Sequence, residues 1–340
     1  MTKLSNNASN GDQQTAAKNA VKLCAVANAV NATNPITDTN FNNLLPGWKI
    51  AWDGQQTAFA NYAFIATDPA EEIYVLAIRG SLVDKNLIDW DDFANWILED
   101  FNVAKQVSWQ FATTANAKIS NGANIGFNNL LNMRDLGNPL LSVTDYLINN
   151  AVKKGKQVII TGHSLGGNIA NVFASYFITT LTQTNLPSGN VSLYTFAAPA
   201  PGNGDFAKDL DAKLPTAWHY QSLNDAIPNF PVASDIRQLV KWYSPAPAAA
   251  AISFTNKEGK IIQLVDAINT LADLLSLTEL LSMSAYKQQA NNYTTFQTDL
   301  YAKAQGNTLA GWLAQAAYQH QLFNYAGYLS VSLKPANQYA

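Results

Sequence analysis

The sequence predicts an α/β fold in which helices cover a mostly parallel central sheet. Between about residues 72 and 223, apolar runs typical of buried strands alternate with segments of helical periodicity. The 340 residues contain no internal repeat, and no change in composition is strong enough to split the chain. We therefore expect a single domain over 1–340 with a core of substantial size.

The first third of the chain predicts one helix and three strands. In the helix, at 14–30, Ala, Val and Leu recur three and four residues apart. An Asn- and Thr-rich loop follows, and the apolar runs after it are assigned to strands at 48–52, 57–67 and 72–78.

The rest of the chain continues this alternation and then becomes mainly helical. The expected elements are, in order, helix 138–154, strand 157–161, helix 167–182, strand 191–196 and strand 217–223. The run SPAPAAAA at 244–251 has the composition most typical of a linker. We interpret 244–290 as a helical insertion in the domain.

The composition restricts the chemistry. The net charge is −3 and there is no long basic run, which argues against a nucleic-acid partner. Cys24 is the only cysteine, so an intrachain disulfide and a cysteine-rich zinc site are excluded. Neither HExxH nor an EF-hand loop occurs, and we expect no metal and no cofactor.

The chain shows no signal for a membrane span or for export. The N-terminus, MTKLSNNASNGDQQ, is polar and has no apolar core of a Sec-type signal peptide. The Leu-rich segment 261–283 carries Asp266, Asp273 and Glu279, which favours an amphipathic helix over a transmembrane one. A cytoplasmic location and export by a leaderless route both stay open, as does the oligomeric state.

Residues 160–167, ITGHSLGG, form a tight turn around Ser164. The turn fits G-x-S-x-G, with an apolar strand before it and a helical pattern after it. In that setting the pattern presents a nucleophilic serine, and we expect Gly162 and Gly166 to let the strand and helix pass closely. The N–H of Leu165 can then meet the negative oxygen of a tetrahedral intermediate. The alternative is an ordinary connection whose glycines serve packing alone.

A serine nucleophile needs a base, and the chain offers three histidines. His163 lies inside the turn and His219 lies in an expected strand, which leaves His320 as the base. Asp225 is the expected acid, because it follows strand 217–223 and the chain order in such sites is serine, acid, histidine. A structural role is the alternative for His320. The acids that we interpret as solvated are Asp205, Asp209, Asp211 and Asp235.

Taken in order, these motifs resemble those of the class 3 lipases, the fungal-type triacylglycerol lipase family of α/β-hydrolases, and especially its bacterial members. The similar stretches are YVLAIRGS (74–81), NWILEDF (95–101), Ile125-Gly126-Phe127, TGHSLGG (161–167), TFAAPAPGNGDF (195–206), LNDAIPNFP (223–231) and AYQH (317–320). Ile227 stands where the family usually has Val, and the stretch from Asp225 to His320 is long.

The resemblance implies an α/β-hydrolase fold and hydrolysis of lipid esters, foremost triacylglycerols, through a Ser164–His320–Asp225 triad and an acyl-enzyme. It also implies Ser81 as the first oxyanion-hole residue, with the N–H of Leu165 as the second. The same site can serve a phospholipase A1, a galactolipase or a feruloyl-type esterase. Outside the enzymes, the alternative is a hydrolase-like scaffold that binds lipid or a protein partner without turnover.

The segment 83–101 mixes aromatic and aliphatic side chains with acids. This amphipathic pattern predicts a lid that covers an apolar site and exposes it at an oil–water interface, where the lipid or ester substrate lies. The residues expected to face substrate are Trp90, Phe93, Trp96 and Ile97. The alternative is a helix that packs permanently on the core. Because the segment is acidic, attraction to anionic membranes is not predicted.

Overall fold

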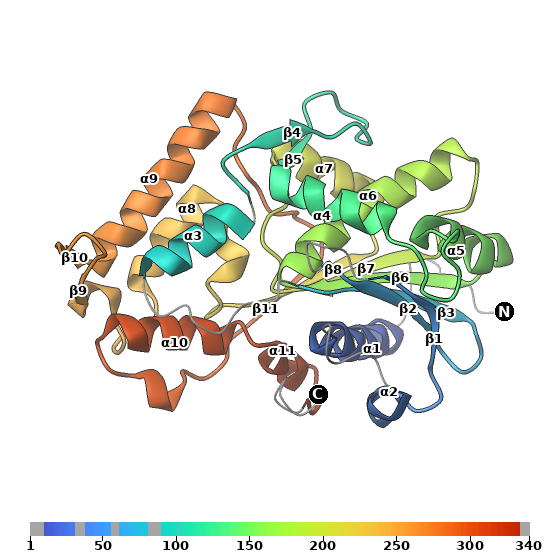
Figure 1. Cartoon of the computed structure of the whole chain (residues 1–340), viewed down its shortest axis with the longest axis horizontal. Helices are drawn as coiled ribbons and strands as arrows, with labels where there is room; N and C mark the ends of the chain where they lie inside the picture. Colours follow the sequence, from blue (N-terminus) through green and yellow to red (C-terminus); the bar gives the residue numbers. More distant parts are fainter. Residues whose placement is uncertain (1–9, 31–37, 56–60, 81–89, 101, 334–340) are drawn as a thin grey trace.

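The computed structural model describes residues 10–30, 38–55, 61–80, 90–100 and 102–333 (Figure 1). In this part of the chain a seven-stranded sheet has the order β1-β2-β3-β6-β7-β8-β11. Its strands are β1 (Lys49–Asp53), β2 (Ala63–Thr67), β3 (Ile73–Ile78), β6 (Gln157–His163), β7 (Val191–Phe196), β8 (Ala217–Ser222) and β11 (Tyr293–Phe296). The pairs β1–β2 and β2–β3 are antiparallel, and from β3 onward every pair is parallel. The predicted mostly parallel sheet is confirmed.

Helices cover both faces of this sheet (Figure 1). On one face lie α4 (Asn121–Asn132), α5 (Val143–Asn150), α6 (Leu165–Gln183) and α7 (Gly204–Lys213), and on the other lie α1 (Asn10–Ala29), α2 (Asp38–Leu44) and α11 (Leu322–Tyr328). Strand β3 contributes side chains to the cores on both faces of the sheet, because successive strand side chains point to opposite faces. Leu76 and Ile78 belong to the core under α6, whereas Val75 and Ala77 belong to the core under α1.

The helix α1 packs one side against the sheet. Ala17, Val21 and Cys24, spaced by four and three residues, are fully buried there. Asn28 continues the same row and is half-buried, at the end of the helix that lies nearest the turn around Ser164. The helical periodicity read from the sequence thus positions a polar amide beside the candidate site.

A third core cluster lies beyond one end of the sheet, to the left in Figure 1. It joins α3 (Trp90–Asp100), α8 (Ala233–Ile236), α9 (Leu264–Ser282) and α10 (Leu309–Gln319). Aromatic rings fill it: Phe93 contacts Phe230 edge-on at a centroid distance of 6.1 Å and Trp312 at 6.0 Å. The buried side chains of α3 pack against the other helices in this cluster.

The insertion 244–290 differs from the helical pattern predicted for it. A two-stranded antiparallel hairpin, β9 (Ser253–Thr255) and β10 (Ile261–Gln263), precedes the 19-residue helix α9. The hairpin turns through NKEGK, where Gly259 has a φ of +80°, a conformation that glycine adopts without strain. None of the helices in the described ranges combines the length and the apolar character needed to cross a bilayer.

Other boundaries also moved. The helix predicted at 138–154 begins only at Val143, because the hydroxyl of Ser142 caps it by accepting the N–H of Asp145 at 3.1 Å. The hairpin β4 (Gln106–Ser108) and β5 (Lys118–Ser120) was not predicted. Strand β11 lies where helices were expected, and its four residues gain their strand conformation from parallel pairing with β8.

Candidate active site

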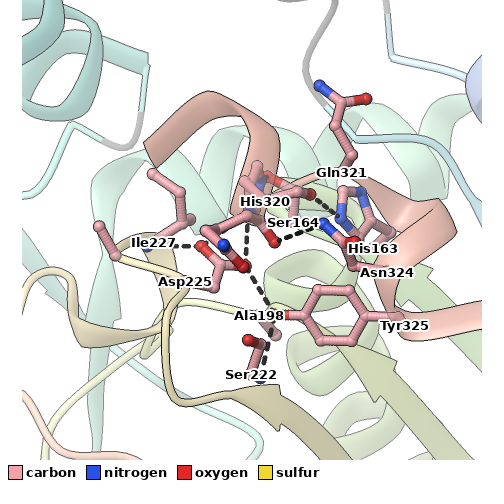
Figure 2. A network of polar contacts seen from close by, with 12 residues as sticks. His163, Ser164, Ala198, Ser222, Asp225, Ile227, His320, Gln321, Asn324 and Tyr325 are labelled. Carbon is pink, nitrogen blue, oxygen red and sulfur yellow. Dashed lines mark hydrogen bonds and ion pairs between the residues drawn. The ribbon is translucent and has the colours of Figure 1, made fainter. Parts of the chain in front are cut away.

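Ser164 occupies the turn between β6 and α6, with a φ of 58° and a ψ of −129° (Figure 2). A positive φ is strained for serine and is typical of a nucleophile at a strand-to-helix turn. A Cβ on Gly162 would lie 2.2 Å from the carbonyl of Gly166, and a Cβ on Gly166 would lie 2.2 Å from the carbonyl oxygen of Ile78. The steric reason predicted for both glycines is confirmed.

The structure brings Ser164, His320 and Asp225 into one line of hydrogen bonds (Figure 2). His320 is the residue at the C-terminal end of α10, and its Nε2 lies 2.8 Å from Oγ of Ser164. Its Nδ1 lies 2.8 Å and 3.1 Å from the two carboxylate oxygens of Asp225. A carboxylate only accepts, so in the neutral ring Nδ1 carries the proton and Nε2 offers its lone pair to the serine hydroxyl.

Asp225 is fully buried just after β8. Besides His320, its carboxylate accepts the hydroxyl of Tyr325 at 2.6 Å and the backbone N–H of Ile227 at 3.0 Å. Burial and the neighbouring Asp225 hold the pKa of Tyr325 well above its usual value, so the phenol remains a donor. Three donors, the Nδ1–H of His320, the hydroxyl of Tyr325 and the N–H of Ile227, therefore fix the orientation of one carboxylate. Tyr325 was not identified from the sequence.

The other two histidines make different contacts from those of His320. His163 is buried behind the nucleophile, and its Nε2 lies 3.0 Å from the backbone carbonyl of His320. Burial, and next the proximity of His320, depress the pKa of His163 well below its usual value, so the ring is neutral. His219 lies in β8, as predicted, where its Nδ1 is 2.7 Å from Oγ1 of Thr195. Burial lowers the pKa of His219 to about 3.

One of the acids that were predicted to be solvated is buried. Asp209 was interpreted as a solvated residue of α7, yet it is only 3% exposed. It pairs with Lys213 at 2.6 Å and accepts the N–H and the hydroxyl of Thr113, each at 2.7 Å. The ion pair with Lys213, one turn further along α7, therefore allows the carboxylate of Asp209 to be buried. The hydrogen bonds from Thr113 to this carboxylate connect α7 to the loop after β4.

The predicted oxyanion-hole residues are only partly described. Leu165 is the first residue of α6, and the first N–H groups of a helix have no carbonyl partner within it. Ser81 lies outside the described residues. Its neighbour Gly80 lies beside the nucleophile, since a Cβ on Gly80 would be 3.5 Å from Cβ of Ser164 and 2.9 Å from the carbonyl oxygen of His163.

The predicted lid segment coincides in part with α3. Trp90 and Phe93 are buried, with exposed fractions of 7% and 4%, and Trp90 packs edge-on against Trp312 at 6.3 Å. Trp96 and Ile97 belong to the same helix, but their side chains lie outside the description. In the residues described, no group of three or more His, Cys, Asp and Glu side chains is arranged to hold a metal ion.

The sheet and the strand–serine–helix turn define an α/β-hydrolase fold, and solved structures share this fold. The crystal structure of M37 lipase superposes with a TM-score of 0.67 at 19% identity, covering 89% of each chain. Lipase II from Rhizopus niveus superposes with a TM-score of 0.51 at 19% identity, covering 67% of this chain and 78% of the other.

Part of the sequence matches the model of a protein family. The model for the family described as lipase (class 3) matches residues 75–234, which include Ser164 and Asp225. The secreted mono- and diacylglycerol lipase 1 of Fusarium solani is 28% identical over 170 residues, half of this chain and 42% of the fungal protein. The match thus spans less than half the length of that curated relative. Residues 75–234 of this chain are thus similar to the class 3 lipases.

Proposed function

We propose that this protein hydrolyses carboxylic esters of lipids, foremost triacylglycerols, with Ser164 as nucleophile, His320 as general base and Asp225 as the acid that orients the base. One observation carries the proposal: His320 bridges the other two side chains, 2.8 Å from the serine hydroxyl and 2.8 Å from the carboxylate. The match of residues 75–234 to the class 3 lipase family supports lipid esters as the substrate class.

In the first half of the reaction, Oγ of Ser164 attacks the ester carbonyl carbon while Nε2 of His320 takes the hydroxyl proton. The carbonyl oxygen becomes the negative oxygen of a tetrahedral intermediate. The buried carboxylate of Asp225 stabilises the imidazolium that forms. His320 then gives its proton to the leaving alkoxide, so the alcohol departs and the acyl group stays on Ser164.

In the second half, a water molecule attacks the acyl carbon while Nε2 of His320 takes one of its protons. The second tetrahedral intermediate breaks at the bond to Ser164, and His320 returns the proton to Oγ. The fatty acid leaves, and the serine hydroxyl is restored. Each half uses the same ring nitrogen, first as base and then as acid, and the Nδ1 contact with Asp225 persists throughout.

For the negative oxygen we propose two backbone donors, the N–H groups of Ser81 and Leu165. The place of Leu165 at the start of α6 supports its role, because the free N–H groups and the positive end of the helix face developing negative charge. The position of Gly80 beside Ser164 supports Ser81. One such donor typically lowers the barrier by about 3 kcal/mol.

We also propose that the chain forms one domain, in which 83–101 acts as a lid and 244–290 as an insertion packed beside it. Trp90 and Phe93 give α3 an apolar side, now buried, that it would expose to lipid on opening. Activity on a short-chain triglyceride should then rise once the ester exceeds its solubility limit, and Trp96→Ala should reduce emulsion activity. If neither happens, α3 is a fixed part of the core.

The substrate is tested by comparing emulsified tri-, di- and monooleoylglycerol with phosphatidylcholine, using the wild-type protein and Ser164→Ala. We expect fatty acid release from trioleoylglycerol by the wild type and only background release by the variant. Release from di- and monooleoylglycerol alone would move the assignment toward the relative from Fusarium solani. A preference for phosphatidylcholine would indicate a phospholipase A1. Full activity in Ser164→Ala would contradict the proposed nucleophile.

A further inference from the structure

The side-chain amide of Asn28 lies between two loops of the candidate site. Its Oδ1 accepts the backbone N–H of Gly80 at 3.1 Å, and its Nδ2 lies 3.3 Å from Nδ1 of His163. Gly80 directly precedes Ser81, and His163 directly precedes Ser164. One residue of α1, which lies before the segment that matches the family, therefore contacts the chain neighbours of the proposed oxyanion donor and of the nucleophile.

The hydrogen-bond partners leave one arrangement of these protons. The N–H of Gly80 only donates, so the amide oxygen of Asn28 must face it and the NH₂ group must face His163. Nδ1 of His163 is then an acceptor, and Nε2 carries the ring proton. That proton points at the backbone carbonyl of His320, 3.0 Å away, which can only accept.

The contact with His320 matters because it holds the backbone of the base rather than its ring. The carbonyl of His320 accepts from His163, while the backbone N–H of His320 donates to the carbonyl of Ala316 at 3.1 Å. The two rings lie 4.8 Å apart, so His163 also forms one wall beside the base (Figure 2). A fixed backbone at this residue, together with the contact of the ring with Asp225, limits the distance between Nε2 of His320 and the serine hydroxyl.

We propose that Asn28 is a positioning residue for ester hydrolysis. Its amide holds the backbone at Gly80, which precedes the proposed oxyanion donor, and, through His163, the backbone of His320 in fixed positions relative to each other. This inference rests on the proposed function. Asn28 touches neither substrate nor reacting atoms; it fixes the base and the loop of the proposed first oxyanion donor relative to each other. Misplacement of such groups by a fraction of an ångström to one ångström lowers kcat while leaving binding of the acyl chain intact.

The test compares Asn28→Leu, Asn28→Asp and the control Gln13→Leu in hydrolysis of p-nitrophenyl butyrate, well below the Tm of every variant. Gln13 lies on the same helix and donates to the hydroxyl of Tyr220 at 2.8 Å, away from Ser164. We expect Asn28→Leu to lower kcat about 10- to 100-fold with KM within about twofold, as for a misplaced catalytic group. Gln13→Leu should retain the wild-type kcat.

Asn28→Asp separates the two contacts of the amide. It keeps an acceptor for Gly80 but loses the donor to His163, so its kcat should lie between those of Asn28→Leu and the wild type. A kcat of Asn28→Leu within twofold of the wild type would overturn the proposal, as would an equal loss in Gln13→Leu. If Asn28→Leu does not fold, a wild-type kcat in Asn28→Asp overturns it instead. A wild-type protein that fails to hydrolyse the ester would refute the proposed function itself.

Discussion

The hydroxyl of Tyr325 donates to Oδ2 of Asp225 at 2.6 Å, and the same oxygen accepts Nδ1 of His320 at 2.8 Å. The phenol and the imidazole therefore share one acceptor, an oxygen of a carboxylate that is fully buried. Hydrogen bonds to a charged group are stronger than those between neutral groups. This shared oxygen links α11 to the candidate triad and makes the geometry of the base sensitive to Tyr325.

Tyr325→Phe should lower both stability and turnover. Loss of a hydrogen bond to a charged group costs about 1.5–3 kcal/mol in unfolding free energy. We expect kcat to fall about tenfold because Asp225 is held less firmly against His320. Urea unfolding and p-nitrophenyl butyrate kinetics measure the two effects. Tyr328→Phe, on the same helix with a side chain 48% exposed, is the control and should change neither. Equal kinetics in both variants would contradict a role of Tyr325 in orienting Asp225.

Gly166→Ala should destabilise the fold strongly, because its methyl group would lie 2.2 Å from the carbonyl oxygen of Ile78. Overpacking against a rigid backbone costs about 1–3 kcal/mol or more. Gly189→Ala is the matched control, since a Cβ there meets no atom within 4 Å. Its stability should stay within about 0.5 kcal/mol of the wild type, as for an ordinary surface change. Equal unfolding midpoints in urea for the two variants would contradict the steric role of Gly166.

Buried neutral histidines predict a loss of stability in mild acid. Burial lowers the pKa of His219 from an ordinary value of 6.5 to about 3. Between these values the unfolded chain binds a proton that the native state refuses, so stability falls as the pH drops below about 6.5. The slope is about 1.4 kcal/mol per pH unit for each such group.

His219→Phe tests this relation and keeps a ring against Tyr293, which stacks on His219 at 4.8 Å. Between pH 6 and 4.5, the unfolding free energy of the variant should decline less steeply by about 1.4 kcal/mol per pH unit. The comparison cancels the carboxylates that both proteins share. Parallel curves for the variant and the wild type would show that His219 protonates in the native state as it does in the unfolded chain.

The candidate triad could be proposed from the sequence because its chemistry restricts residue type and order. Only three histidines exist, and one serine sits in a strand-to-helix turn with glycines two residues away on each side. The steric part of that prediction, at Gly162 and Gly166, is confirmed by the backbone contacts. The parallel sheet followed from the same alternation of strands and helices. Ser81, in contrast, was proposed through family resemblance alone.

The supporting contacts could not be predicted, because no local pattern announces them. Asn28 is 135 residues from His163 in the chain, and Tyr325 is 100 residues from Asp225. Each depends on how α1 and α11 lie on the sheet. The predicted exposure of Asp209 was wrong for a related reason. A helical pattern indicates on which face of a helix a residue lies, but the burial of that face depended on the loop around Thr113. Strand β11 is too short to show a period of its own.

The central claim is that His320 and Asp225 make Ser164 a nucleophile, and covalent labelling tests it most directly. The intact protein is treated with an alkyl fluorophosphonate, and mass spectrometry measures the adduct and the peptide that carries it. We predict one adduct per chain on the peptide containing Ser164, none on Ser164→Ala, and much slower labelling of His320→Ala. An unlabelled wild-type protein, or an adduct on another serine, would contradict the account.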